Sequence, residues 1–251
     1  MDTIGFYDSG VGGISVLKEA LKWLPNENYV YFGDTKNAPY GTKKQEQIED
    51  YALNAVEMLL KKNAKAIVIA CNTATSAAAA MLRSRFDLPI IGMEPALKPA
   101  HEMRKNGSIL VMATPLTLEL PKFQNLMRQY GEETIPVPCP GLMEFAESGI
   151  FEGEALEKHI LSLIGGYLNA PIDAIVLGCT HYVFLKKTIQ KLLPSDTHVI
   201  DGNLGTVRQL ERKLIEINKL TPHTQKGSME ICISDENPKT RALIADLLYK
   251  I

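Results

Sequence analysis

The segment Ala66-Ile67-Val68-Ile69-Ala70-Cys71-Asn72-Thr73 has a similar counterpart later in the chain, Ala174-Ile175-Val176-Leu177-Gly178-Cys179-Thr180-His181. Each copy is a run of apolar, largely β-branched residues, followed by a small residue, a cysteine and two hydrogen-bonding residues. Such a run predicts a buried strand. In a parallel sheet the functional crevice lies just beyond the carboxyl ends of the strands. We therefore expect two thiols at equivalent strand ends of two related halves.

The rest of the chain alternates between predicted strands and helices in two cycles. The clearest helix has apolar residues at spacings of three and four from Ile48 to Leu60. This alternation predicts an α/β protein with mostly parallel sheets and helices on both faces. Because Cys71 and Cys179 occupy matching places in the two cycles, we expect two pseudo-symmetric α/β domains with the active site in the cleft between them.

The domain boundaries follow from the two cycles, because no Gly/Ser-rich or Pro-rich linker marks them. We place the crossings near residues 97 and 206. The first domain then consists of residues 1–97 plus 207–251, and the second of residues 98–206. The last predicted strand and helix are expected to return to the first domain.

The composition is that of an ordinary globular protein. The chain has 251 residues, is 45% hydrophobic and 22% charged, and has a net charge of −2, so it can bury a core without disulfides or metal ions. This charge favours neither a nucleic-acid partner nor a membrane partner. The start, Met1-Asp2-Thr3-Ile4, lacks a basic region, and no apolar stretch approaches the ~18 residues that span a bilayer. We expect a cytoplasmic protein.

The four cysteines include no C-x-x-C pair, which argues against zinc ribbons and thioredoxin-type chemistry. A disulfide framework is not expected in a reducing compartment. Cys139 and Cys232 are interpreted as small core residues. Cys71 and Cys179 differ from them because their sequence contexts match each other.

Asp8-Ser9-Gly10-Val11-Gly12-Gly13 follows the first predicted strand. Its glycines lack the spacing of a dinucleotide loop, and no Gly-Lys-Ser/Thr follows. Glycines before a helix still let backbone N–H groups approach an anion such as a substrate carboxylate. The alternative is a tight turn in which Asp8 caps the helix. Because Asp8 and Ser9 end a strand, they are expected in the same crevice as Cys71.

Asn72-Thr73 and Thr180-His181 each follow a cysteine directly. Together with the backbone N–H groups of the next helix, these side chains can bind a carboxylate and an ammonium group. The alternative for Asn72-Thr73 is that they cap the helix. His181 lies two residues after Cys179, and a neighbouring imidazolium lowers the pKa of a thiol from its usual ~8.5.

Four further residues complete the candidates. Asp34 follows a predicted strand and Glu147 lies in Phe-Ala-Glu-Ser-Gly, and both are interpreted as supporting acids. Tyr40-Gly41 lies in a polar loop that is long enough to fold over a site.

Several reactions use thiols. One cysteine with a histidine can act as a nucleophile in acyl transfer, which leaves the duplicate unexplained. Two thiols and a histidine can bind a metal ion, but the sequence offers no clear further ligand. A redox pair would ordinarily have the C-x-x-C spacing. Inversion of a carbon stereocentre needs a base on one face and an acid on the other, and a pair of thiols meets that need in both directions.

Four segments resemble signature segments of the glutamate racemase family: Asp8-Ser9-Gly10-Val11-Gly12-Gly13, Pro39-Tyr40-Gly41-Thr42, Ala70-Cys71-Asn72-Thr73-Ala74 and Gly178-Cys179-Thr180-His181-Tyr182. They occur in the family's order, and the likeness covers nearly the whole chain. The resemblance implies interconversion of L- and D-glutamate without a cofactor or a metal ion, which supplies D-glutamate for peptidoglycan. It also implies a homodimer.

The resemblance implies a role for each candidate residue. The two bases on opposite faces of the substrate carbon are Cys71 and Cys179. The residues that assist catalysis are Asp8, His181, Asp34 and Glu147. The residues that hold the substrate are Asp8, Ser9, Tyr40, Gly41, Asn72, Thr73, Thr180 and His181.

Two other functions remain open. The chain could racemise another acidic amino acid such as aspartate, although aspartate racemases usually carry glutamate where His181 stands. It could also be a non-catalytic amino-acid-binding protein on a two-lobed scaffold. Such a protein would need neither cysteine.

Overall fold

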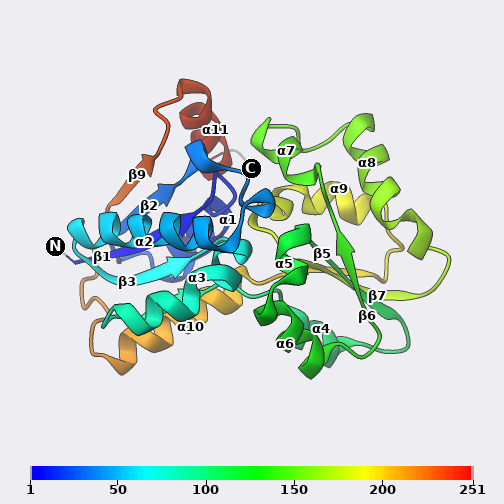
Figure 1. The fold of residues 1–251 in the computed structure, drawn as a ribbon, viewed down its shortest axis with the longest axis horizontal. Coiled ribbons are helices and arrows are strands. Elements are labelled where there is room, and N and C mark those ends of the chain that lie inside the picture. Colours follow the sequence, from blue (N-terminus) through cyan, green and yellow to red (C-terminus); the bar gives the residue numbers. More distant parts are fainter. Residues whose placement is uncertain (1, 250–251) are drawn as a thin grey trace.

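The computed structural model describes residues 2–249, which form two lobes side by side (Figure 1). Each lobe is built on one parallel sheet. The strand order is β4-β3-β1-β2-β9 in the first lobe and β6-β5-β7-β8 in the second. Strands β1 to β4 and β5 to β8 take the same order in their sheets. The predicted α/β fold with two related, mostly parallel halves is therefore confirmed.

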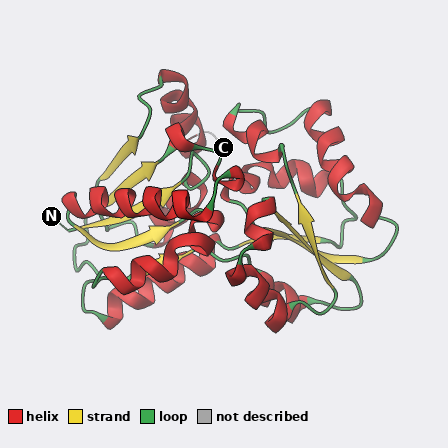
Figure 2. Ribbon diagram, in the orientation of Figure 1, coloured by secondary structure: helices red, strands yellow, loops and turns green. Residues whose placement is uncertain are grey.

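Strands and helices alternate along the chain, and helices flank both sheets (Figure 2). The first sheet consists of β1 (Thr3–Asp8), β2 (Tyr29–Gly33), β3 (Ala64–Ile69), β4 (Ile90–Gly92) and β9 (Met229–Ile233). The second sheet consists of β5 (Ser108–Ala113), β6 (Thr134–Pro138), β7 (Ile172–Leu177) and β8 (His198–Asp201).

The helices that pack mainly in the first lobe are α1 (Ile14–Trp23), α2 (Gln45–Lys61), α3 (Asn72–Arg85), α10 (Asn203–Glu216) and α11 (Pro238–Tyr249). Those of the second are α4 (Leu97–Met103), α5 (Pro115–Glu119), α6 (Pro121–Tyr130), α7 (Leu142–Glu147), α8 (Glu154–Ile164) and α9 (Lys186–Lys191). Short 3₁₀ turns are η1 (Thr35–Asn37), η2 (Tyr40–Thr42), η3 (Gly165–Tyr167) and η4 (Thr180–Leu185). None of the helices within residues 2–249 combines the length and apolar character needed to cross a membrane.

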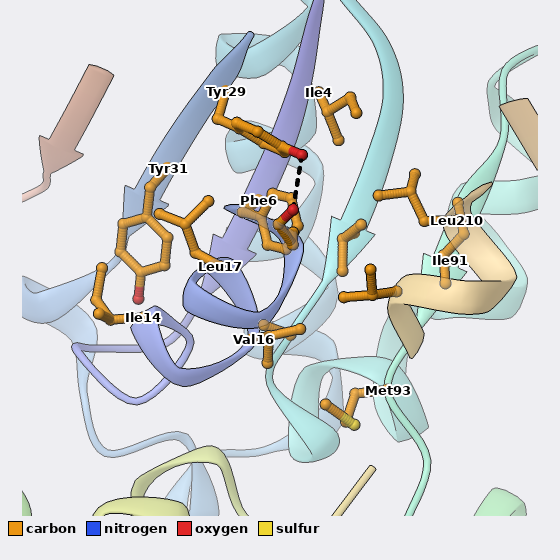
Figure 3. Packing of buried hydrophobic residues seen from close by; sticks show 14 of the residues in the cluster. Ile4, Phe6, Ile14, Val16, Leu17, Tyr29, Tyr31, Ile91, Met93 and Leu210 are labelled. Carbon is orange, nitrogen blue, oxygen red and sulfur yellow. Dashed lines mark hydrogen bonds between the residues drawn. The ribbon is translucent and has the colours of Figure 1, made fainter. Parts of the chain in front are cut away.

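Strand β1 shows why the first sheet is covered on both faces. Ile4 and Phe6 pack with α1, α10 and α11, whereas Tyr7 packs with α2 and α3 on the other face. The rings of Phe6 and Tyr29 meet edge to face with their centroids 5.8 Å apart (Figure 3). Burial of an aliphatic or phenyl side chain of this size stabilises the fold by about 1.5–3 kcal/mol. Parallel pairing, with Tyr7 opposite Ile69, places the carboxyl end of β1 beside that of β3.

The last strand returns to the first sheet, as the sequence predicts. Strand β9 pairs in parallel with β2, from Tyr29 against Met229 to Gly33 against Ile233. Helix α11 then packs beside α1 (Figure 1). The predicted helix extends to Ile251, and its final two residues, Lys250 and Ile251, lie outside the described residues.

The domain boundaries at 97/98 and 206/207 stay a prediction. Leu97 and Ala100 of α4 belong to the core of the second lobe. Val207 and Leu210 of α10 belong to the core of the first lobe. The crossing placed at residue 206 falls inside α10, which begins at Asn203.

Two segments differ from the elements that periodicity predicts. Residues 116–130 are predicted as one helix, but Leu120 is extended and separates α5 from α6. The reason is Pro121, whose ring disfavours helical backbone in the residue before it. No pattern predicts α4, because its seven residues bury only Leu97 and Ala100 and are too short to show a repeating stripe.

Candidate active site

Both repeated cysteines stand at carboxyl ends of central strands, on the sides of the two lobes that face each other. Cys71 follows β3 and Cys179 follows β7. Both are buried, neither forms a disulfide, and both line one cavity of about 10 Å³, which has room for about one water molecule. Residues of both lobes line it: Ser9, Tyr40, Gly41, Cys71, Asn72, Thr73, Thr114, Met143, Gly178, Cys179, Thr180 and His181.

Cys71 lies at the N-cap of α3, where its sulfur accepts a hydrogen bond from the Ala74 N–H at 3.4 Å. Burial raises the pKa of the Cys71 thiol to about 11, and the nearby Asp8 carboxylate acts in the same direction. Hydrogen bonds from Ser9 and Ala74 oppose the rise in this pKa without cancelling it. Cys71 is therefore a neutral thiol at pH 7.

Cys179 is the first member of a chain of three side chains. Its Sγ lies 3.6 Å from His181 Nδ1, and His181 Nε2 lies 2.6 Å from Glu147 Oε1. Burial acts to lower the pKa of His181, but the hydrogen bonds to Cys179 and Glu147 outweigh it and raise this pKa well above the ordinary value. Burial acts to raise the pKa of Glu147, and the interaction with His181 outweighs it, so this pKa is lowered. The imidazole therefore carries a positive charge beside Cys179.

Asp8 joins the two lobes beneath the cavity. Its fully buried carboxylate accepts hydrogen bonds from the Gly10 N–H at 3.0 Å and from Thr180 Oγ1 at 3.2 Å. Burial raises the pKa of Asp8, and the His181 charge opposes this rise. The N-cap of α1 is Gly13, with no side-chain capping bond. The interpretation of Asp8 as a helix cap is therefore wrong.

Asp34 acts on the loop that covers the site. Its carboxylate accepts hydrogen bonds from the Tyr40 hydroxyl at 2.6 Å and from the Asn37 amide at 3.0 Å. The hydroxyls of Tyr7 and Tyr40 lie 2.6 Å apart. Because Tyr40 already donates its single hydroxyl proton to Asp34, Tyr7 is the donor in this second hydrogen bond. Hydrogen bonds to two buried side chains, Tyr7 and Asp34, thus fix Tyr40, and with it Gly41, at the wall of the cavity.

Asn72 and Thr73 lie in the first turn of α3, because Cys71 occupies the N-cap. The capping interpretation of this pair is therefore wrong. Asn72 Oδ1 is buried and has no hydrogen-bond partner among the described residues. Such an acceptor at the cavity wall suits an ammonium group. The Thr73 hydroxyl contacts those of Thr114 and Thr117, which belong to the other lobe.

No group of three or more His, Cys, Asp and Glu side chains within residues 2–249 is arranged to hold a metal ion. The chemistry available from the described side chains is that of two thiols, each with a charged neighbour, around a small enclosed space.

The sequence model of the Asp/Glu/Hydantoin racemase family matches residues 12–210. The chain belongs to the Asp/Glu/Hydantoin racemase family. Among relatives, the glutamate racemase of Clostridium perfringens is 52% identical over 248 residues, which cover 98% of this chain and 95% of the relative. The resemblance to glutamate racemases that the four segments indicate is confirmed.

Solved structures of this racemase family have the same fold. The glutamate racemase of Thermus thermophilus, in complex with beta-chloro-D-alanine, is 32% identical and superposes with a TM-score of 0.86 over 100% of this chain and 94% of that one. The glutamate racemase of Francisella tularensis, in complex with D-glutamate, is 28% identical, with a TM-score of 0.85 over 98% and 93% of the two chains.

The predicted site residues of this racemase family member fall into two groups. Those that line the cavity are Ser9, Tyr40, Gly41, Cys71, Asn72, Thr73, Cys179, Thr180 and His181. Asp8, Asp34 and Glu147 lie behind it and hold lining residues by hydrogen bonds. Sequence reasoning missed Thr114 as a lining residue. Its position in the sequence could have identified it. Thr114 directly follows β5, and β5 corresponds to β1, whose carboxyl end leads directly to the lining residue Ser9.

Proposed function

We propose that this chain interconverts L- and D-glutamate by moving a proton between the two faces of the substrate Cα, with Cys71 and Cys179 as the two bases. The observation that carries the proposal is that both thiols, from equivalent strand ends of the two lobes, line one cavity. The substrate comes from the relatives, which are named glutamate racemases.

In one direction the Cys179 thiolate takes the Cα proton, and the Cys71 thiol then gives its proton to the opposite face and is left as a thiolate. One C–H bond breaks and an S–H bond forms, then the other S–H bond breaks and a new C–H bond forms. The thiols exchange roles in the reverse reaction. Because the raised pKa keeps Cys71 protonated at neutral pH, Cys71 is ready as the acid. The positive charge of His181 stabilises negative charge on Cys179 and in the carbanionic transition state.

The polar lining supplies the substrate contacts. Asn72 Oδ1 accepts a hydrogen bond from the ammonium group, and the hydroxyls of Ser9 and Thr73 donate to the carboxylates. Thr180 lines the same cavity, with its hydroxyl proton given to Asp8. Asp34 and Glu147 assist from behind, through Tyr40 and His181. A cavity of about 10 Å³ is too small for glutamate. The two lobes therefore separate to admit the substrate and close over it.

A circular-dichroism assay tests the substrate assignment. The purified chain, without added cofactor, is incubated with L-glutamate and, separately, with L-aspartate. We expect the optical signal of glutamate to decay to zero and that of aspartate to persist. Decay with aspartate alone would assign the chain to a different acidic amino acid. Binding of glutamate with no change of signal would favour the non-catalytic alternative.

Cysteine substitutions in heavy water test the two-base mechanism. The wild-type product should carry solvent deuterium at Cα. Cys71→Ala and Cys179→Ala should each lower racemisation by at least ~10³-fold, because general acid–base catalysis contributes about 10²–10⁴-fold for each proton transfer. Each variant keeps one thiol, so each should exchange the Cα proton of one enantiomer only, and the two variants should exchange opposite enantiomers.

Cys232→Ala is the matched control, since Cys232 lies on β9 outside the cavity. It should racemise glutamate at the wild-type rate. Near-normal racemisation by either Cys71→Ala or Cys179→Ala would disprove the two-base mechanism.

We further infer that the chain acts as a cytoplasmic homodimer and supplies D-glutamate for peptidoglycan, as the family resemblance implies. Sedimentation analysis measures the assembly. Growth of a deletion strain with and without D-glutamate measures the physiological role.

A further inference from the structure

Three buried threonine hydroxyls form a closed triangle between the lobes. Thr73 Oγ1 lies 3.1 Å from Thr114 Oγ1 and 2.9 Å from Thr117 Oγ1, and the last two lie 2.9 Å apart. Thr73 belongs to α3 of the first lobe, whereas Thr114 and Thr117 belong to the cap and first turns of α5 in the second. Thr73 and Thr114 line the cavity, and Thr117, which is fully buried, does not.

The protons of this triangle can be counted. A hydroxyl has one proton and two acceptor sites, so three mutual bonds use all three protons. Thr114 Oγ1 also accepts the Thr117 N–H at 3.3 Å, which fills both of its acceptor sites. In the closed triangle, therefore, neither Thr73 nor Thr114 has a proton left for a molecule in the cavity.

A carboxylate in the cavity accepts hydrogen bonds and cannot donate them. To bind it with two hydroxyls, Thr73 and Thr114 must both turn their protons toward it, which opens the triangle. The oxygen of Thr73 then lacks a donor from Thr114. Thr117 can supply that donor, because its hydroxyl lies 2.9 Å from each of the other two.

We propose that Thr117 is a positioning residue for substrate binding, and that its hydroxyl releases the protons of Thr73 and Thr114 to a substrate carboxylate. This inference rests on the proposed function. Thr117 acts through the other two threonines and touches neither the substrate nor the sulfurs. Without its hydroxyl, either one ligand hydrogen bond is lost or a buried oxygen is left without a donor, and both outcomes weaken binding.

Thr117→Val tests the inference, because valine keeps the shape and removes the hydroxyl. We expect KM for both glutamate enantiomers to rise about tenfold, which corresponds to ~1.4 kcal/mol, while kcat stays within about twofold of wild type. Thr117→Ser, which restores the hydroxyl, should return KM to the wild-type value. If Thr117→Val does not fold, Thr117→Ala is compared with Thr117→Ser in the same way.

Thr188→Val is the matched control. It removes a buried hydroxyl, which donates to the Phe151 carbonyl at 2.6 Å, from α9 outside the cavity. It should lower stability without moving KM. An unchanged KM in Thr117→Val, or a loss confined to kcat, or no rescue by serine, would overturn the role of Thr117 while wild-type racemisation stands. A wild-type chain that does not racemise glutamate would overturn the proposed function itself.

Discussion

At the scale of single residues, His181 shows how neighbours decide a charge. A buried imidazole in an apolar setting loses its proton, yet Glu147 Oε1 at 2.6 Å and the Cys179 sulfur at 3.6 Å hold it on His181. Glu147 in turn accepts the Val11 N–H at 3.2 Å. The charge beside Cys179 therefore depends on a carboxylate that contacts backbone of the other lobe.

Glu147→Gln should destabilise the protein in a pH-dependent way. The folded pKa of His181 is raised, so its contribution to stability is fully present below the unfolded value of ~6.5 and is lost as pH rises through the folded value. The folded pKa of Glu147 is lowered, so its contribution is present above the unfolded ~4.3 and is lost as pH falls. The loss in Glu147→Gln should therefore be largest between pH ~5 and ~6.5, at about 2 kcal/mol, as is typical of a hydrogen bond to a charged group.

Urea denaturation of both proteins from pH 5 to pH 9 measures this difference. Glu157→Gln serves as the control, because Glu157 pairs with Lys191 at the surface and such pairs contribute about 0–1 kcal/mol. A stability difference between wild type and Glu147→Gln that grows steadily toward pH 9 would contradict the assignment of the charge to His181.

For single residues, the sequence predicts which side chains gather at the cavity but not which hydrogen bonds they form. The repeat identifies the two strand-end cysteines and the residues after them as cavity residues. It does so because the carboxyl end of a parallel strand fixes where the next residues lie relative to the sheet. The role of Asp34 depends on Tyr40 and Tyr7, whose hydroxyls meet through tertiary packing alone. Thr117 shows no pattern that distinguishes it from any other threonine in a helix.

At the scale of elements, the turn from β1 into α1 is packed directly against η4. A Cβ on Gly12 would lie 2.6 Å from His181 Nδ1 and would also meet the Thr180 hydroxyl. Ser15 of α1 donates to the Thr180 carbonyl at 3.3 Å. The glycine at position 12 is thus required for close approach of the two lobes at the Cys179 side of the cavity.

Gly12→Ala should leave each lobe folded and keep the site from closing. We expect racemisation to fall by at least ~10²-fold, because a displacement of about 1 Å in a catalytic site has that effect. Gly205→Ala is the matched control, since a Cβ there meets nothing within 4 Å and α10 gains a better helix former. Its activity should be normal. Full activity in Gly12→Ala would show that this contact does not limit closure.

The helices and strands are predicted well where the pattern of apolar residues extends over many residues. The sequence places the strands of both sheets and the stripe of α2, since buried runs and repeated spacings leave little ambiguity. It does not place α4 or the break at Leu120, because a seven-residue helix has no repeat and the break depends on one proline.

At the scale of the whole molecule, the two lobes meet in a closed arrangement. The contacts across the site include Val11 with Glu147, Asp8 with Thr180 and Thr73 with Thr117. The central strand β5, in contrast, is bonded on both sides within its own sheet. Separation of the lobes would break the hydrogen bonds between them and leave those of β5 within its sheet intact.

Hydrogen exchange of the free protein should show this difference. The Val11 amide, which donates across the lobes, should exchange at least ~10-fold faster than the amides of β5, because it needs only local opening. Added glutamate should slow the exchange of Val11 and leave β5 unchanged. Equal rates for Val11 and β5 without glutamate would contradict opening by lobe separation.

The pairing of β9 with β2 has a consequence for synthesis of the chain. The strands of the second sheet, at residues 108–201, are translated before β9, which completes the first sheet. The second lobe therefore leaves the ribosome with all its described strands while β2 still has an unpaired edge, the kind of edge that invites aggregation. Domains generally fold from the N-terminus during translation. In this nascent chain four strands of the N-terminal lobe are translated first, yet its sheet is the last of the two to be completed.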